Sequence, residues 1–147
     1  MITLPSFLSV AHLVGLALGL GAATVKLALL LRCRADRAFL PVYQEVARPI
    51  TRQIVLGMIL LTLSGVGWLF LGYPWTPLLV VKLVLVAAIW VLGPVIDNVA
   101  EPNFTALAPA PGSAASPAFL RAQGRYLALE SLATSLFYVL VVLGALR

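Results

Sequence analysis

Four long apolar stretches constrain the fold of this 147-residue chain more than any other feature of its sequence. A helix needs roughly 20 mainly apolar residues to cross the hydrocarbon core of a bilayer. The stretches at 7–31 and 78–96 have about that length, the stretch at 54–71 is slightly shorter, and the one that ends at 146 has a helical lead-in from 121. We therefore predict an all-α fold in which residues 1–147 form a single transmembrane domain, a four-helix bundle with helices at about 7–31, 54–71, 78–96 and 121–146.

Composition agrees with a membrane protein, since 62% of the residues are hydrophobic and 10% are charged. The formal charge of +5 comes from arginines that flank apolar stretches. It does not form a basic patch with interleaved aromatic residues, so we expect the lipid bilayer and no nucleic acid as a partner. The single cysteine, Cys33, excludes an internal disulfide, a CxxC redox pair and covalent haem attachment.

The three connections differ in character. Residues 32–53 carry apolar side chains at helical spacing among charged ones, which predicts a short amphipathic helix at the membrane interface between helices 1 and 2. Residues 72–77 read GYPWTP and predict a tight turn. Residues 97–117 are rich in Pro, Ala and Ser and predict a flexible loop, in which Asp97 and Glu101 form a solvated helix end.

Basic residues predict the orientation, because cytoplasmic loops carry an excess of Lys and Arg. The first connection holds five arginines and the start of the fourth helix holds two: Arg32, Arg34, Arg37, Arg48, Arg52, Arg121 and Arg125. The tight turn holds none. We expect a multi-pass protein of the cell (inner) membrane with both termini on the non-cytoplasmic side.

Four ionisable residues fall within the predicted spans, where such groups are costly and often mark function. They are His12, Lys26, Lys82 and Glu130. With the predicted topology, Lys26 and Glu130 share the cytoplasmic leaflet, and we expect a structural ion pair between them. His12 and Lys82 share the opposite leaflet, so the sequence predicts one polar layer near each face of the membrane.

One face of the first helix combines His12, Gly15, Gly19 and Lys26. The two glycines form a GxxxG pair, which lets another helix or a flat ligand approach closely. His12 is consistent with a haem-iron ligand, another metal ligand, a proton carrier or a histidine hydrogen-bonded to a neighbouring helix. Lys82 is consistent with a polar partner of His12 or with a side chain that extends to the interface.

Three segments resemble small bacterial membrane bundles, the superfamily of HemJ-type protoporphyrinogen oxidases and copper-resistance CopD-like proteins. The similar motifs, within residues 8–97, are His12-Leu-Val-Gly15 with Gly19 and Arg32, Leu-Thr62-Leu-Ser64-Gly65 after Gly57, and Val81-Lys82-Leu83-Val84. The resemblance implies a haem b site with His12 as ligand and Lys82 near it. The chain departs from the family pattern at 97–98, where Asp-Asn replaces an expected histidine.

The sequence contains no recognisable catalytic constellation, and we expect no catalytic residues and favour a protein without enzymatic activity. The leading hypothesis is a bundle that binds haem or another hydrophobic cofactor near His12, Lys82, Gly15 and Gly19. The alternative is an accessory subunit that packs against other membrane protein subunits, or against copies of itself.

Overall fold

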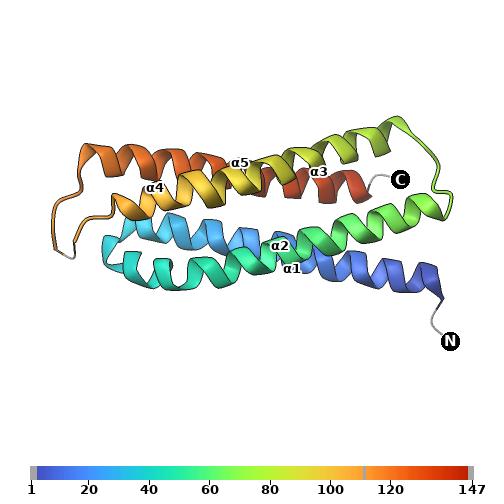
Figure 1. Cartoon of the computed structure of the whole chain (residues 1–147), viewed down its shortest axis with the longest axis horizontal. Coiled ribbons are helices and arrows are strands. Elements are labelled where there is room, and N and C mark those ends of the chain that lie inside the picture. Colours follow the sequence, from blue (N-terminus) through green and yellow to red (C-terminus); the bar gives the residue numbers. More distant parts are fainter. Residues whose placement is uncertain (1–2, 111, 146–147) are drawn as a thin grey trace.

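The computed structural model describes residues 3–110 and 112–145, which are helical apart from short connections and contain no strand. The elements follow in the order α1 (Leu4–Ala35), η1 (Arg37–Phe39), α2 (Leu40–Phe70), α3 (Pro77–Val95), η2 (Ile96–Ala100), α4 (Glu101–Ala106) and α5 (Pro117–Ala145). Because α3, η2 and α4 follow one another without interruption, the chain forms four long rods (Figure 1).

All four rods are long and apolar enough to cross a membrane, which confirms the predicted all-α arrangement of four candidate spans. They contain 29 to 34 residues each. At a rise of 1.5 Å per residue the rods are roughly 44–51 Å long, well beyond the roughly 30 Å of a hydrocarbon core. The rods therefore extend past the apolar layer.

Two expected boundaries were wrong. Residues 40–53 do not form a separate short helix, because they are the first part of α2, which continues through Pro49. Residues 97–106 are not a flexible loop, because they continue the third rod as η2 and α4. An apolar run marks the part of a helix that lies in lipid, and a helix can continue beyond it when polar residues still pack on neighbouring helices.

Caps and prolines account for the helix ends. Thr3 and Thr76 each accept a hydrogen bond from a backbone amide of the first turn, of α1 and α3 respectively. α1 ends at Ala35 and is followed by Asp36, whose side chain accepts a hydrogen bond from the Ala38 amide at the start of η1. Gly72, with a φ of +83°, makes the turn after α2.

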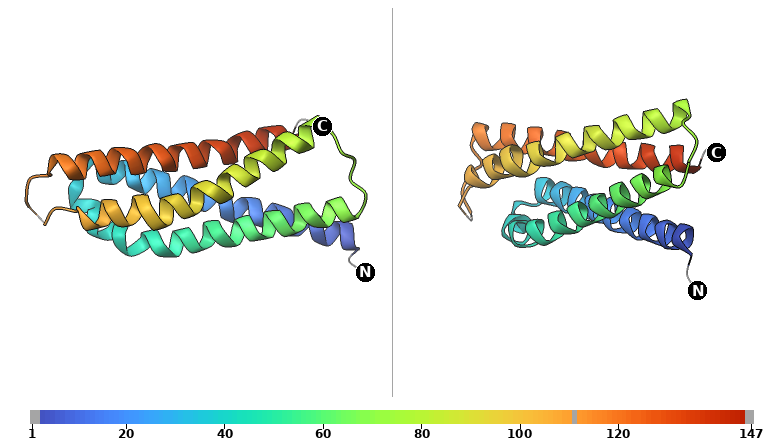
Figure 2. Two further views of the ribbon diagram at one scale, coloured as in Figure 1. Left: turned by 45° about the horizontal axis from the view of Figure 1, so that its top comes forward. Right: turned by 45° about the vertical axis from the view of Figure 1, so that its right-hand side comes forward.

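The rods are arranged as an open ring. α1 packs against both α2 and α5, and α5 packs against α3, whereas α2 and α3 contact each other little. The neighbours around the ring are therefore α2, α1, α5 and α3 (Figure 2), and a pocket lined from both α2 and α3 leaves an opening between these two rods.

Both described ends of the chain lie at the same end of the bundle, together with the turn 71–76 (Figure 1). The other end holds the turn from α1 into α2 and the loop residues 107–110 and 112–116. We name it the basic end, because seven arginines lie on or near it: Arg32, Arg34, Arg37, Arg48, Arg52, Arg121 and Arg125.

Candidate functional site

The most polar part of the interior surrounds the ammonium group of Lys26 on α1. Lys26 Nζ lies 2.8 Å from a carboxylate oxygen of Glu101, 2.8 Å from Glu130 and 3.6 Å from Asp97. The Lys26 side chain is 1% exposed and that of Glu130 is 4% exposed. We name these four residues the charge cluster. Its ion pairs join α1 to the third rod and to α5.

The pair expected from the sequence, Lys26 with Glu130, is thus in contact, and Asp97 and Glu101 join it instead of forming a solvated helix end. The prediction for Asp97 and Glu101 was wrong because it assumed that the third helix stops before Asp97. η2 is a π-helical turn that follows Pro94, a residue without an N–H group for the ladder. Such turns occur frequently at functional sites.

A pair of tyrosines extends the charge cluster toward the basic end. Tyr126 donates a hydrogen bond to Glu101 at 2.9 Å, so its oxygen accepts from the Tyr43 hydroxyl, 2.6 Å away. Both rings are buried, and they pack with Phe104 and Phe119, which are 0% and 1% exposed. This aromatic layer separates the charge cluster from water at the basic end.

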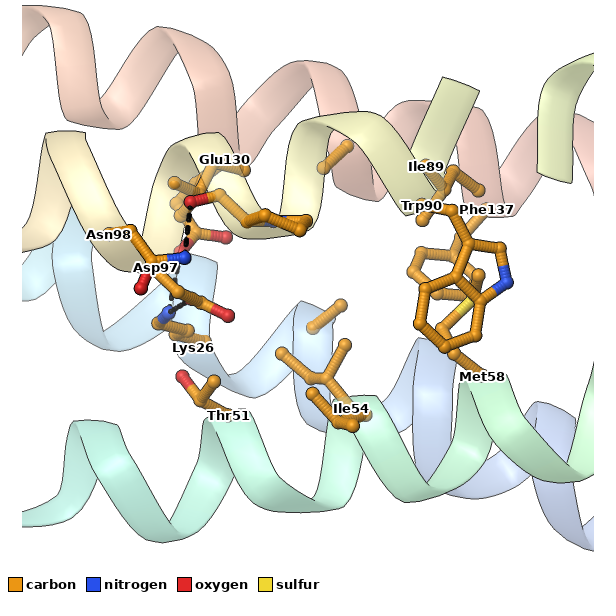
Figure 3. A pocket seen from close by; sticks show the side chains of 16 residues that line it. Lys26, Thr51, Ile54, Met58, Ile89, Trp90, Asp97, Asn98, Glu130 and Phe137 are labelled. Carbon is orange, nitrogen blue, oxygen red and sulfur yellow. Dashed lines mark hydrogen bonds and ion pairs between the residues drawn. The ribbon is translucent and has the colours of Figure 1, made fainter. Parts of the chain in front are cut away.

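On its other side the charge cluster opens into a pocket of about 380 Å³. The pocket occupies the opening between α2 and α3, and α1 and α5 form its floor. Lys26, Asp97, Asn98 and Glu130 gather at one end of it (Figure 3). Apolar side chains line the rest, among them Ile54, Met58, Ile89, Trp90 and Phe137. The pocket therefore has a polar end and an apolar end.

Two acceptor atoms at the polar end of the pocket have hydrogen-bonding capacity that the described residues do not use. Thr51 Oγ1 is buried without a partner. Glu130 Oε1 has the Lys26 ammonium as a partner, 2.8 Å away, and no second partner among the described residues. Buried polar atoms in proteins are almost always hydrogen-bonded, and an exception calls for an explanation such as a bound molecule.

At the apolar end, Trp90 on α3 donates a hydrogen bond to Thr62 on α2 at 3.0 Å. This bond links the two rods on either side of the opening, beside the pocket that Trp90 lines. Trp90 is 39% exposed, so its ring lies at the outer rim.

No family model, curated protein or solved structure matches this chain. Its function must therefore follow from the arrangement of its own residues. Within residues 3–110 and 112–145, no three His, Cys, Asp or Glu side chains are grouped so as to hold a metal ion. The carboxylates of the charge cluster face an ammonium group instead.

The second predicted polar layer is much sparser. His12 is exposed, and its Nδ1 lies 2.9 Å from the hydroxyl oxygen of Ser64 on α2. Lys82 is half-buried and makes no ion pair with any described residue. This layer has one hydrogen bond between helices where the charge cluster has several ion pairs.

Gly15 and Gly19 form the contact surface between α1 and α2. A Cβ atom on Gly15 would lie 2.9 Å from the carbonyl oxygen of Gly57, and one on Gly57 would collide with the backbone of Gly19. Phe137 approaches Gly19 from α5, so that a Cβ there would lie 3.3 Å from its ring. The space that the glycines leave is filled by neighbouring helices.

The residues around His12 do not fit the haem b that the family resemblance implies. Neither of the two pockets described in the bundle is lined by His12, Lys82, Gly15 or Gly19. Helix packing occupies the glycine face, and Ser64 occupies one ring nitrogen of His12. A haem needs a cavity around an accessible axial ligand, and the ligand that His12 would supply lies on an outer face.

Sequence reasoning found Lys26 and Glu130 but missed Asp97, Glu101 and the Tyr43–Tyr126 pair as members of the site. One signal was available, since Asp97 and Glu101 are spaced i, i+4 and so lie on one face of a continuing helix. The pocket has no comparable sequence signal, because it results from how α2 and α3 diverge.

Proposed function

We propose that this chain is a membrane-embedded binding protein that accepts a small amphipathic molecule from the bilayer through the opening between α2 and α3. The observation that carries the proposal is the pocket, which joins a polar end at the charge cluster to an apolar end lined by Met58, Ile89 and Phe137. Ligand sites between helices of a bundle have this composition, mainly apolar with a few placed polar groups.

The depth of the pocket supports a ligand that is aligned like a lipid. Lys26 lies nine residues before the end of α1 at Ala35, about 14 Å along the helix axis. Because the rods overshoot the hydrocarbon core, the charge cluster lies near one boundary of that core. The apolar end of the pocket lies toward the middle of the rods, since Met58, which lines it, is near the centre of α2. A bound molecule would keep its head near the headgroups and its tail in the apolar layer.

The proposal includes an orientation. Among the described residues, seven arginines lie at the basic end and Lys82 lies near the opposite end, which supports a cytoplasmic basic end by the positive-inside rule. Both termini would then lie on the non-cytoplasmic side of the cell membrane, and the head of the ligand would lie in the cytoplasmic leaflet. Residues 37–46, at the start of the second rod, would lie at the interface.

Photolabelling of the protein in lipid nanodiscs tests the proposed binding. The probe is an alkyl alcohol with a diazirine in its chain, followed by mass spectrometry of the labelled peptides. We expect saturable labelling of the segments 54–58 and 89–93, which face each other across the pocket.

Two leucine variants form a matched pair for this experiment. A Cβ at Gly93, which lines the pocket, meets no atom within 4 Å, so Gly93→Leu fills the opening without a backbone clash. Gly65 on α2 is equally unobstructed but does not line the pocket. Labelling should be lost in Gly93→Leu and kept in Gly65→Leu. Labelling that is unsaturable and equal in both variants would contradict the proposal.

A further inference from the structure

The charge cluster contains more negative than positive groups. One ammonium group, that of Lys26, faces the three carboxylates of Asp97, Glu101 and Glu130. When all four groups are ionised, the cluster carries two more negative charges than positive ones. An uncompensated charge at membrane depth is strongly unfavourable, and a further cation or protonation of a carboxylate relieves it.

From this imbalance, and resting on the proposed function, we infer that the ligand is an amphipathic amine whose protonated head binds between Asp97 and Glu130 at the polar end of the pocket. Asp97 is the most exposed of the three carboxylates, with 32% of its side chain accessible, whereas Glu101 is 17% exposed and does not line the pocket. The negative charge that an incoming head meets therefore comes from Asp97 and Glu130.

The two acceptor atoms with unused hydrogen-bonding capacity at the polar end of the pocket can both bind an ammonium group. Glu130 Oε1 belongs to a side chain that is 4% exposed, and Thr51 Oγ1 lies on the facing rod α2. An ammonium head supplies three N–H donors, which matches a site formed by Asp97, Glu130 and Thr51. Charge-assisted hydrogen bonds of this kind are about twice as strong as neutral ones.

An anionic head would meet a less suitable site. Among the described residues, the only cation that lines the pocket is Lys26, whose side chain is 1% exposed and whose ammonium lies within 4 Å of three carboxylates. The Tyr126 ring covers Lys26 as well, with its centre 5.7 Å from Nζ. Binding an anion would require Lys26 to leave these partners, so electrostatic complementarity favours a cation.

Three diazirine probes with the same alkyl chain and different heads test the charge of the ligand. The heads are a primary amine, an alcohol and a carboxylate, each added at neutral pH to wild-type protein in nanodiscs of uncharged lipid. We expect the amine to label the pocket segments at a concentration at least about tenfold lower than the alcohol, and the carboxylate to label them most weakly. An alcohol or carboxylate that labels as well as the amine would overturn the inference.

Asp97→Asn keeps the shape of the side chain and removes the charge that faces the pocket, while Lys26 retains Glu101 and Glu130. We expect this variant to need about tenfold more amine for half-saturation and to bind the alcohol as before. Asp36→Asn is the matched control, because Asp36 lies in the turn after α1, outside the pocket. An equal loss in both variants, or an unchanged amine affinity in Asp97→Asn, would overturn the inference.

The proposed binding function and the inferred cationic head of the ligand are contradicted by different results. If no probe labels the pocket segments saturably, the proposed binding function is contradicted. If the alcohol labels them and the amine has no advantage, the pocket binds amphiphiles and the inferred cationic head is wrong. Alcohol labelling of Asp97→Asn also reports whether the variant is folded, so a loss of amine binding alone is specific to charge.

Discussion

The bundle has two polar layers, and they differ in how much of each is buried. Near the basic end, Lys26 is 1% exposed and has three carboxylates within 4 Å. Near the opposite end, His12 is exposed and shares one hydrogen bond with Ser64, and Lys82 is half-buried without an ion pair among the described residues. A charge at membrane depth must find partners when it is buried, whereas one on an outer face can extend toward the interface.

The comparison also separates two uses of polar residues in a membrane. The His12–Ser64 bond joins α1 to α2, which already pack closely through Gly15, Gly19 and Gly57. The charge cluster joins α1 to the third rod and to α5, across the floor of a pocket. The first layer adds a bond to an existing contact, while the second determines the chemistry of an internal space.

The largest expected effect is that of Lys26→Met, which leaves the buried carboxylate of Glu130 and the two half-buried carboxylates of Asp97 and Glu101 without their cation. Removing one partner of a buried charge pair costs about 3–5 kcal/mol. We expect the variant to lose that much free energy of unfolding, measured by titration with a denaturing detergent, or to fail to accumulate. Lys82→Met is the control and should change the stability by less than about 1 kcal/mol. Equal losses would show that the layers do not differ as described.

Gly57→Leu tests the contact between α1 and α2 that lies between the two layers. A side chain at position 57 would push against the backbone of Gly15 and Gly19, and overpacking of this kind costs about 1–3 kcal/mol. We expect a lower thermal midpoint in mild detergent. Gly65→Leu on the same helix meets no atom within 4 Å and should stay near wild type. A stable Gly57→Leu protein would mean that α1 and α2 are further apart than described.

Tyr126→Phe tests how much the hydroxyl hydrogen bonds in the buried layer contribute to stability. The hydroxyl of Tyr126 donates to Glu101 and accepts from Tyr43, so its removal leaves the buried Tyr43 hydroxyl without a partner. We expect a loss of about 1–3 kcal/mol in the free energy of unfolding. Tyr138→Phe removes a hydroxyl that bonds Thr24 at an exposed site and should cost less. The opposite order would place the more important hydroxyl on the surface of the bundle.

The smallest expected effect is that of His12→Ala. Single hydrogen bonds between membrane helices contribute about 0.6 kcal/mol on average, so we expect a change of about that size. A double-mutant cycle with Ser64→Ala isolates the bond itself. Oxidised and reduced optical spectra should show no Soret band in either protein. A band in the wild type that disappears in His12→Ala would instead support the haem hypothesis from the family resemblance.

Sequence reasoning predicted the parts of the fold that depend on apolar length. The four candidate spans and the proximity of Lys26 and Glu130 follow from hydropathy and from the alternating direction of successive helices. The helical extensions at 40–53 and 97–106 could not be predicted in the same way, since polar residues that pack on neighbouring helices resemble loop residues in composition. The pocket depends on the separation of α2 and α3, which no local pattern records.

The charge cluster also has a consequence for biogenesis. The contact between Lys26 and Glu101 spans 75 positions, and Glu130 comes later still, so Lys26 is synthesised long before its partners. Until the third and fourth rods are inserted and packed, its ammonium has no partner in the cluster. An incomplete bundle therefore carries an unpaired ammonium group, which gains its carboxylate partners only when the third rod and α5 have packed against α1.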